Sequence, residues 1–219
     1  GVSDLMLSWT LGGYPSLCLA HAAKYFYENC DMPEQSDNEK RACEFICEAL
    51  NEFPPDARLQ YHGPQNSGPS APLYDVPTGY SSTMTCFPYD NVEYWCEEFP
   101  QEIVIAQLEK VCNLMSKALE LLGKEATTET EIMALATYYT YKSALNQFQF
   151  IRARDCKDYA TMVQKAQGEV DTARGMLSLM NKNAAIAFEA ANQYYYSKGQ
   201  LAEKIINCQY IIEKYSKKN

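Results

Sequence analysis

The stretch PQEIVIAQLEKVCNLMSKALELLG (100–123) decides the fold class of this chain of 219 residues. Its apolar residues recur at alternating spacings of four and three, which is the pattern of one buried face on an α-helix. Pro100 suits the first position of a helix, and Gly123 suits its end. The apolar stripe consists of Val104, Leu108, Val111, Met115, Ala118 and Leu122. We therefore predict a long helix that buries this face against neighbouring helices.

Three more helices are predicted after this one. Thr128 and Glu131 have capping-box spacing and precede the long stretch 132–154. The next stretch repeats the alternating spacing, and a fourth helix is expected from near Ala184 to Tyr215, with a bend near Gly199. The repeated stripe consists of Tyr159, Val163, Ala166, Val170, Ala173, Leu177 and Met180. Long helices with short connections predict an antiparallel helical bundle over 100–219.

The N-terminal zone, 1–53, has a different pattern. The compact apolar run LMLSW (5–9) is typical of a buried parallel strand. The stretch PSLCLAHAAKYFYE (15–28) begins with a proline and has the composition of a helix. Ser36 and Glu39 form a second capping box, which starts a helix that should end before the proline pair that follows. This zone is therefore expected to hold one strand and two helices.

The middle zone, 54–99, and the Pro100 that follows it contain eight of the ten prolines. Prolines at this density exclude long helices and central strands. The zone is also rich in tyrosine, which distinguishes it from a solvated linker. We predict a long, ordered and packed loop, with short strands at 58–63 and 81–87.

The composition excludes several functional classes. The apolar fraction of 47% and the charged fraction of 21% are typical of a globular protein. The net charge of −9 argues against binding to nucleic acid or to anionic membranes. No apolar run approaches the roughly 20 residues of a membrane span, and no signal peptide is visible. We expect a cytoplasmic protein without a cofactor.

The nine cysteines do not form a recognisable metal or disulfide pattern. No CxxC pair occurs, and Cys43 and Cys47 alone cannot make a zinc site. The two histidines, His21 and His62, stand in no ligand spacing. We predict reduced and mostly buried cysteines, and no metal site.

No common catalytic motif is present: the sequence contains no GxSxG, P-loop, GxGxxG or HExxH. Asp90 is notable because FPYDNVEYW (87–95) surrounds it with aromatic residues. The favoured interpretation is a local Asx turn after Pro88. The alternative is a carboxylate on an aromatic platform, which suits a sugar. Glycoside hydrolysis would need a second carboxylate, and the sequence indicates no clear partner.

Polar and aromatic residues gather in three other places. The loop carrying Tyr61, His62, Gln65 and Asn66 could bind hydroxyl groups, or its side chains could satisfy their own backbone. Two helical stretches also mix amides with tyrosines, and for both we favour hydrogen bonds buried between helices over a ligand site. Their polar and aromatic residues are Lys142, Asn146 and Gln149 in the first, and Glu189, Asn192, Gln193 and Tyr194 to Tyr196 in the second.

Four segments together resemble the C-terminal region of large bacterial glycoside-hydrolase-like proteins. They are LMLSWTLGGYPS (5–16), GPQNSGPSAPLY (63–74), TGYSSTMTCFPYDNVEYW (78–95) and FEAANQYYYSKGQLAEKIINC (188–208). The resemblance implies a (β/α)8 barrel of the hexosaminidase style upstream. The run LMLSWT would be its last strand and 15–28 the helix that follows.

The resemblance also implies a role at a sugar site. Active sites of such barrels lie at the C-terminal ends of the strands, so Trp9 and the loop after it would face the sugar. The catalytic carboxylates would lie on earlier strands, so this chain would carry no catalytic residue and would be inactive alone. The substrate-binding candidates are Trp9, Tyr14, Tyr61, His62, Gln65, Asn66, Tyr80, Asp90 and Trp95.

Two further interpretations remain open. The chain could be a helical interaction or scaffold module, with the proline-rich loop and Tyr194 to Tyr196 as core or oligomer contacts. It could also be a stand-alone carbohydrate-binding module. The expected partner is carbohydrate, bound by the intact parent protein. Self-association is expected through an unpaired strand or exposed aromatics.

Overall fold

The computed structural model describes residues 35–52, 68–79, 90–96, 99–184, 186, 188–189, 193–194 and 197–218. This part of the chain is mainly helical, as the sequence predicts. The helices are α2 (Asp37–Glu52), α4 (Val92–Cys96), α5 (Gln101–Leu122), α6 (Glu129–Asp155), α7 (Tyr159–Lys182), α8 (Lys198–Tyr215) and the short 3-10 turn η1 (Ser216–Lys218). The predicted strand at 5–9 and helix at 15–28 lie outside the described residues.

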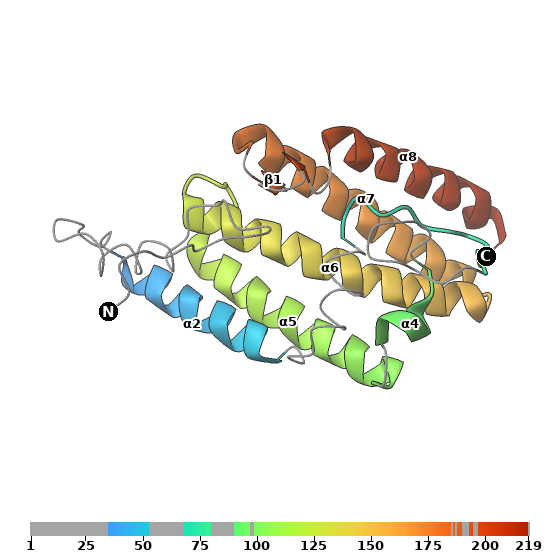
Figure 1. The fold of residues 1–219 in the computed structure, drawn as a ribbon, viewed down its shortest axis with the longest axis horizontal. Helices are drawn as coiled ribbons and strands as arrows, with labels where there is room; N and C mark the ends of the chain where they lie inside the picture. The colour runs from blue at the N-terminus through green and yellow to red at the C-terminus, as the bar shows by residue number, and fades with distance from the viewer. Residues whose placement is uncertain are drawn as a thin grey trace.

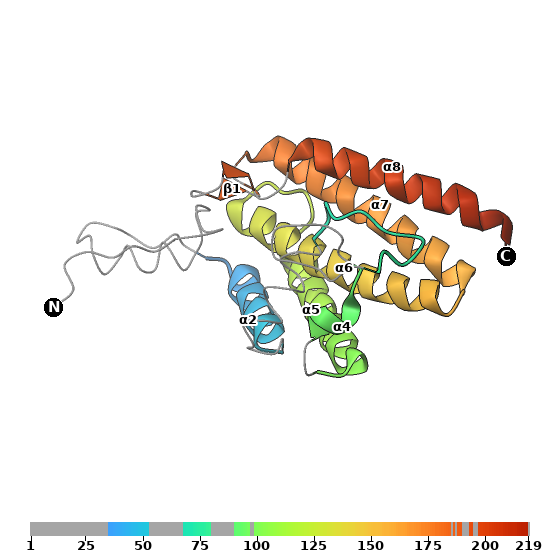
Figure 2. The same cartoon turned by 45° about the vertical axis from the view of Figure 1, so that its right-hand side comes forward.

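The long helices pack in a row, and each one contacts the next. Helix α2 packs on α5, α5 on α6, α6 on α7, and α7 on α8. Figure 1 shows these neighbours running in alternating directions, and Figure 2 shows α7 and α8 side by side after rotation. This antiparallel arrangement agrees with a helical bundle.

Helices α2 and α5 begin and end close to the positions that the sequence indicates. The Ser36 hydroxyl accepts from the Glu39 amide at 3.2 Å, and the Glu39 carboxylate accepts from the Ser36 amide at 2.8 Å, so the predicted capping box forms. Pro100 is the N-cap of α5 and precedes the first helical residue, one position earlier than expected. Gly123 ends α5 with a φ of 99°, which glycine adopts without strain.

Helix α6 has a modified version of the predicted capping box. The Thr128 hydroxyl accepts from the Glu131 amide at 3.2 Å, as expected. The Glu131 carboxylate, however, accepts from the amide and the hydroxyl of Thr127, at 2.8 and 2.9 Å. The glutamate therefore holds the residue before the N-cap.

The prediction of a fourth helix starting near Ala184 is wrong. Helix α7 ends at Lys182, and Phe188–Glu189 (β1) pairs antiparallel with Gln193–Tyr194 (β2) before α8 begins at Lys198. Ser197 and Gln200 form a complete capping box, which fixes this start. Gly199 lies in the first turn of α8, and Tyr194 lies in a short strand.

Residues 68–79 of the proline-rich zone form a packed segment, which we call the strap. It contains four residues with little or no solvent exposure, namely Gly68, Pro69, Ala71 and Leu73. Its hydrogen bonds to α6 and α8 place it between these helices, where it crosses α7 (Figure 1). The strap is thus packed against α6 and α8, while most of the zone 54–99 lies outside the described residues. The predicted strands at 58–63 and 81–87 lie outside the described residues.

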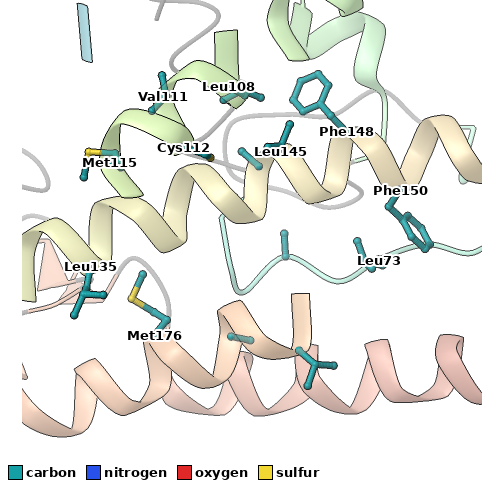
Figure 3. Packing of buried hydrophobic residues seen from close by; sticks show 14 of the residues in the cluster. Leu73, Leu108, Val111, Cys112, Met115, Leu135, Leu145, Phe148, Phe150 and Met176 are labelled. Atoms are coloured by element: carbon teal, nitrogen blue, oxygen red, sulfur yellow. The ribbon is translucent and has the colours of Figure 1, made fainter. Parts of the chain in front are cut away.

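The core fills the contacts between successive helices. In Figure 3, Leu108 and Cys112 of α5 point toward Leu145 of α6, and Phe150 points to the side where the strap carries Leu73. The side chains that Figure 3 labels are all buried in the core. Burial of each large aliphatic or aromatic side chain stabilises the fold by about 1.5–3 kcal/mol.

Candidate functional site

Arg154, near the end of α6, donates hydrogen bonds to two carboxylates and one carbonyl. Its Nη1 donates to Asp90 Oδ2 at 2.8 Å and to the Tyr74 carbonyl at 3.1 Å. Its Nε donates to Asp155 Oδ1 at 2.8 Å. The side chains of Arg154 and Asp90 are each only 5% exposed, whereas that of Asp155 is 52% exposed. The guanidinium therefore lies inside the protein, with one of its carboxylate partners at the surface.

Asp90 is bonded to residues that are distant in the sequence. Besides Arg154, its Oδ2 accepts from the Thr78 amide at 3.0 Å, and its Oδ1 accepts from the Thr78 hydroxyl at 2.5 Å. The carboxylate thus joins the end of the strap to α6. The favoured sequence interpretation, a local Asx turn after Pro88, differs from this arrangement because a buried guanidinium offers Asp90 a stronger partner than its own turn would.

A pocket of about 310 Å³ lies beside this cluster. The end of the strap, the start of α4, the start of α5 and the end of α6 contribute its walls. Three of its residues are carboxylates and two are guanidiniums. The lining residues are Pro77, Gly79, Asp90, Asn91, Val92, Glu93, Gln101, Ile151, Arg152, Arg154 and Asp155. The pocket is therefore rich in groups that exchange hydrogen bonds with a polar ligand.

Asp90 is the sequence-predicted site residue that lines this pocket. Trp95 belongs to α4, but its side chain is outside the described part of the structure. The other candidates, namely Trp9, Tyr14, Tyr61, His62, Gln65, Asn66 and Tyr80, lie outside the described residues as well.

The contribution of α6 to the pocket was not predicted from the sequence. Arg152, Arg154 and Asp155 stand at the end of a long helix, where charged residues usually mark a solvated terminus. One signal was present: the side chain at 154 follows the buried Phe150 by one helical turn, so it points to the same face.

A second polar cluster is closed to solvent. Lys204 Nζ lies 2.7 Å from Glu169 Oε2, and both side chains are 0% exposed. Ser143 donates to the same carboxylate at 2.7 Å, Asn146 donates to it at 3.0 Å, and Lys204 also donates to the Ala71 carbonyl. This cluster confirms the expectation that Asn146 is buried between helices. Gln149, in contrast, is only half-buried and donates to Glu109 at 2.9 Å in a solvent-exposed hydrogen bond.

Side chains of α6 and α8 hold the backbone of the strap. Asn207 accepts from the Leu73 amide at 2.8 Å and donates to the Leu73 carbonyl at 3.0 Å. Gln147 donates to the Gly68 carbonyl at 3.1 Å. These bonds satisfy polar groups that the proline-rich segment cannot satisfy through a helix or a sheet. The strap is consequently held at Gly68 and Leu73, upstream of the residues that line the pocket.

The described residues offer little for other kinds of chemistry. Burial raises the pKa of the Cys96, Cys112 and Cys208 thiols to about 12, so these thiols are poor nucleophiles. None of the six cysteines of the described part is in a disulfide, and three of them are buried. No group of three or more potential metal ligands occurs in that part. Among its helices, none has an apolar stretch long enough to cross a bilayer.

Comparisons with protein-family models, with curated proteins and with solved structures gave no match for this chain.

Proposed function

We propose that this chain is the helical, non-catalytic part of a glycoside-hydrolase-like protein and that it borders a carbohydrate site. The observation that carries the proposal is the place of Asp90, which the sequence singles out and which lies in the wall of the polar pocket. The segment 78–95, which carries the family resemblance, supplies two sides of this pocket.

The chemistry of the pocket suits a sugar. Hydroxyl groups both donate and accept, and they need carboxylates, amides and guanidiniums as partners. Hydrogen bonds from hydroxyls to carboxylates are charge-assisted and roughly twice as strong as neutral ones. Asn91 and Gln101 add amides, and Ile151 adds an apolar surface for the C–H face of a sugar ring.

The non-catalytic part of the proposal rests on how the carboxylates are used. Asp90 and Asp155 both accept from Arg154, so both serve as hydrogen-bond acceptors to a fixed cation. A glycosidase needs one carboxyl group that donates a proton to the leaving oxygen. We expect the purified chain to hydrolyse no member of a panel of aryl glycosides, and clear turnover would contradict this.

A titration followed by NMR tests the binding role. Neutral methyl glycosides added to the full chain should shift the Gln101 side-chain amide and the Glu93 backbone amide, with a dissociation constant on the order of 1 mM. Asp155→Ala should weaken the binding. Glu120→Ala removes an exposed carboxylate at the other end of α5 and should leave it unchanged. Absence of any chemical-shift change at the pocket residues would contradict the proposal.

A second candidate function is a helical interaction module. Its supporting observation is a pair of exposed apolar side chains one turn apart on α8, Ile206 at 67% and Tyr210 at 55% exposure. In this case a second copy of the chain would cover them. Size-exclusion chromatography should then show a dimer that Tyr210→Ser and Ile206→Ser convert to a monomer, and a wild-type monomer at all concentrations would exclude it.

A further inference from the structure

The charges around the pocket show which class of sugar it can accept. This inference rests on the proposed carbohydrate function and deepens it. We infer that the pocket binds an uncharged sugar and rejects sugars that carry a carboxylate, such as uronic acids. Some of the charged groups of the pocket are paired inside the protein, and others face the ligand.

The charge of the buried guanidinium is already paired with two carboxylates of the protein. Arg154 donates to Asp90, to Asp155 and to the Tyr74 carbonyl, and its side chain is only 5% exposed. An acidic sugar would have to displace one of these carboxylates or compete with them for the remaining N–H groups of the guanidinium. Displacement of Asp90 would also break its two hydrogen bonds to Thr78. The cation that would normally select an anionic ligand is therefore already neutralised.

The remaining charges favour a neutral ligand. The lining contains three carboxylates, Asp90, Glu93 and Asp155, against two guanidiniums, Arg152 and Arg154, which leaves one net negative charge. Glu93 and Asp155 are exposed, so they meet the ligand directly. Their repulsion of a ligand carboxylate opposes binding, and the exposed Arg152 offers only a solvent-screened attraction.

A neutral sugar can form hydrogen bonds with the same carboxylates that repel an acidic sugar. Its hydroxyls can donate to the open carboxylate edge of Asp155 and to Glu93, in charge-assisted hydrogen bonds. The amide of Gln101, which is half-buried at the start of α5, can accept from or donate to a further hydroxyl. The same groups that repel a uronate can thus bind the hydroxyl groups of a neutral sugar.

Matched pairs of sugars test this inference on the full chain. Each neutral methyl hexoside is compared with the uronic acid of the same ring configuration, at constant ionic strength and neutral pH. We expect at least one neutral sugar to bind about tenfold or more tightly than its uronic acid. Asp155→Asn removes one of the negative charges that face the ligand. It should therefore bring the dissociation constants of the neutral sugar and its uronic acid closer together. Glu120→Gln is the control, because it makes the same change about 28 Å along α5 from Gln101 and should leave the ratio as it is.

The outcomes separate the two proposals. If a uronic acid binds as tightly as its neutral partner or more tightly, the carbohydrate function stands and the charge selection is wrong. The same conclusion follows if Asp155→Asn and Glu120→Gln change the ratio equally. If neither member of any pair binds at the pocket, the proposed carbohydrate function itself is wrong. The inferred preference for neutral sugars is then wrong as well.

Discussion

Two buried ion pairs in the described part of the chain have similar chemistry and different surroundings. Lys204 and Glu169 are wholly enclosed by α6, α7, α8 and the strap. Arg154 and Asp90 are almost as buried, but their cluster extends through Asp155 to a pocket. Enclosure makes the first pair a structural element, because no water can replace a lost partner. Access to the pocket lets the second pair combine a structural role with a place beside a ligand.

The strongest test of this difference removes the enclosed cation. Lys204→Met should lower the free energy of unfolding by about 3–5 kcal/mol, because Glu169 would stay buried without its partner. Urea denaturation followed by circular dichroism measures the change.

Two variants make this test specific. Lys217→Met removes an exposed lysine and should change stability by less than about 0.5 kcal/mol. Combining Lys204→Met with Glu169→Gln should restore part of the loss, since no buried charge would remain. A loss of less than about 1 kcal/mol for Lys204→Met would show that water reaches the pair.

The pair beside the pocket should be less sensitive. Arg154→Met should cost about 2–3 kcal/mol, below the range for enclosed pairs, because Asp90 keeps its bonds to Thr78 and water can enter from the pocket. Arg152→Met is the matched control two residues away on an exposed position, and should cost less than about 0.5 kcal/mol. Urea denaturation measures both changes. If Arg152→Met and Arg154→Met lower the free energy of unfolding equally, the buried arginine contributes no more to stability than the surface one.

The close contact of α6 with α7 offers a third test. A Cβ added at Gly175 would lie 2.4 Å from Tyr139 Cζ, so Gly175→Ala should force the helices apart and cost about 1–2 kcal/mol. Glu169 lies on the same helix, so NMR shifts should spread to the enclosed pair and spare the pocket. At Gly199 the nearest atom is 3.6 Å away, so Gly199→Ala should not destabilise α8. A stable Gly175→Ala variant would mean that Tyr139 moves away without cost.

The smallest effect is expected at the partly exposed ion pair of Asp75 and Lys214. Burial raises the pKa of Asp75, but hydrogen bonds from Lys214 and Tyr215 more than offset this, so the pKa lies below its ordinary value of 3.8. The stabilisation is therefore present above the ordinary value and is lost as the pH falls through the lower value of the folded state. The difference in urea midpoint between wild type and Asp75→Asn should be larger at about pH 6 than at about pH 2. A difference that does not change with pH would show that this carboxylate adds no pH-dependent stability.

Much of the helical framework could be predicted from the sequence, because it rests on local signals. The apolar stripe of α5 and the capping residues Ser36, Thr128 and Gly123 act over one or two turns, and each lies at or near a real helix boundary. The start of α8 carried the same kind of signal at Ser197 and Gln200. It was missed because the alanine-rich stretch before it has high helix propensity and gave no sign of the β1–β2 turn.

The site could be predicted only in part, because its partners are far apart in the sequence. Asp90 was noticed for its aromatic neighbours, yet its strongest partner is Arg154, 64 positions away on α6. Likewise, Lys204 looks like an ordinary surface lysine until α7 supplies Glu169. Pairing across such distances depends on how the helices pack, which no local pattern contains.

The attachment of the strap has a consequence for how the chain is synthesised. Leu73 bonds to Asn207 across 134 positions, and Asp75 bonds to Lys214 across 139. Chains emerge from the ribosome N-terminus first, and contacts at long sequence separation form slowly. The strap thus emerges long before α8, which binds it at Ala71, Leu73 and Asp75. A nascent chain, or one truncated within α8, would therefore lack these bonds and hold the strap through Gln147 and Arg154 of α6 and through Asp90.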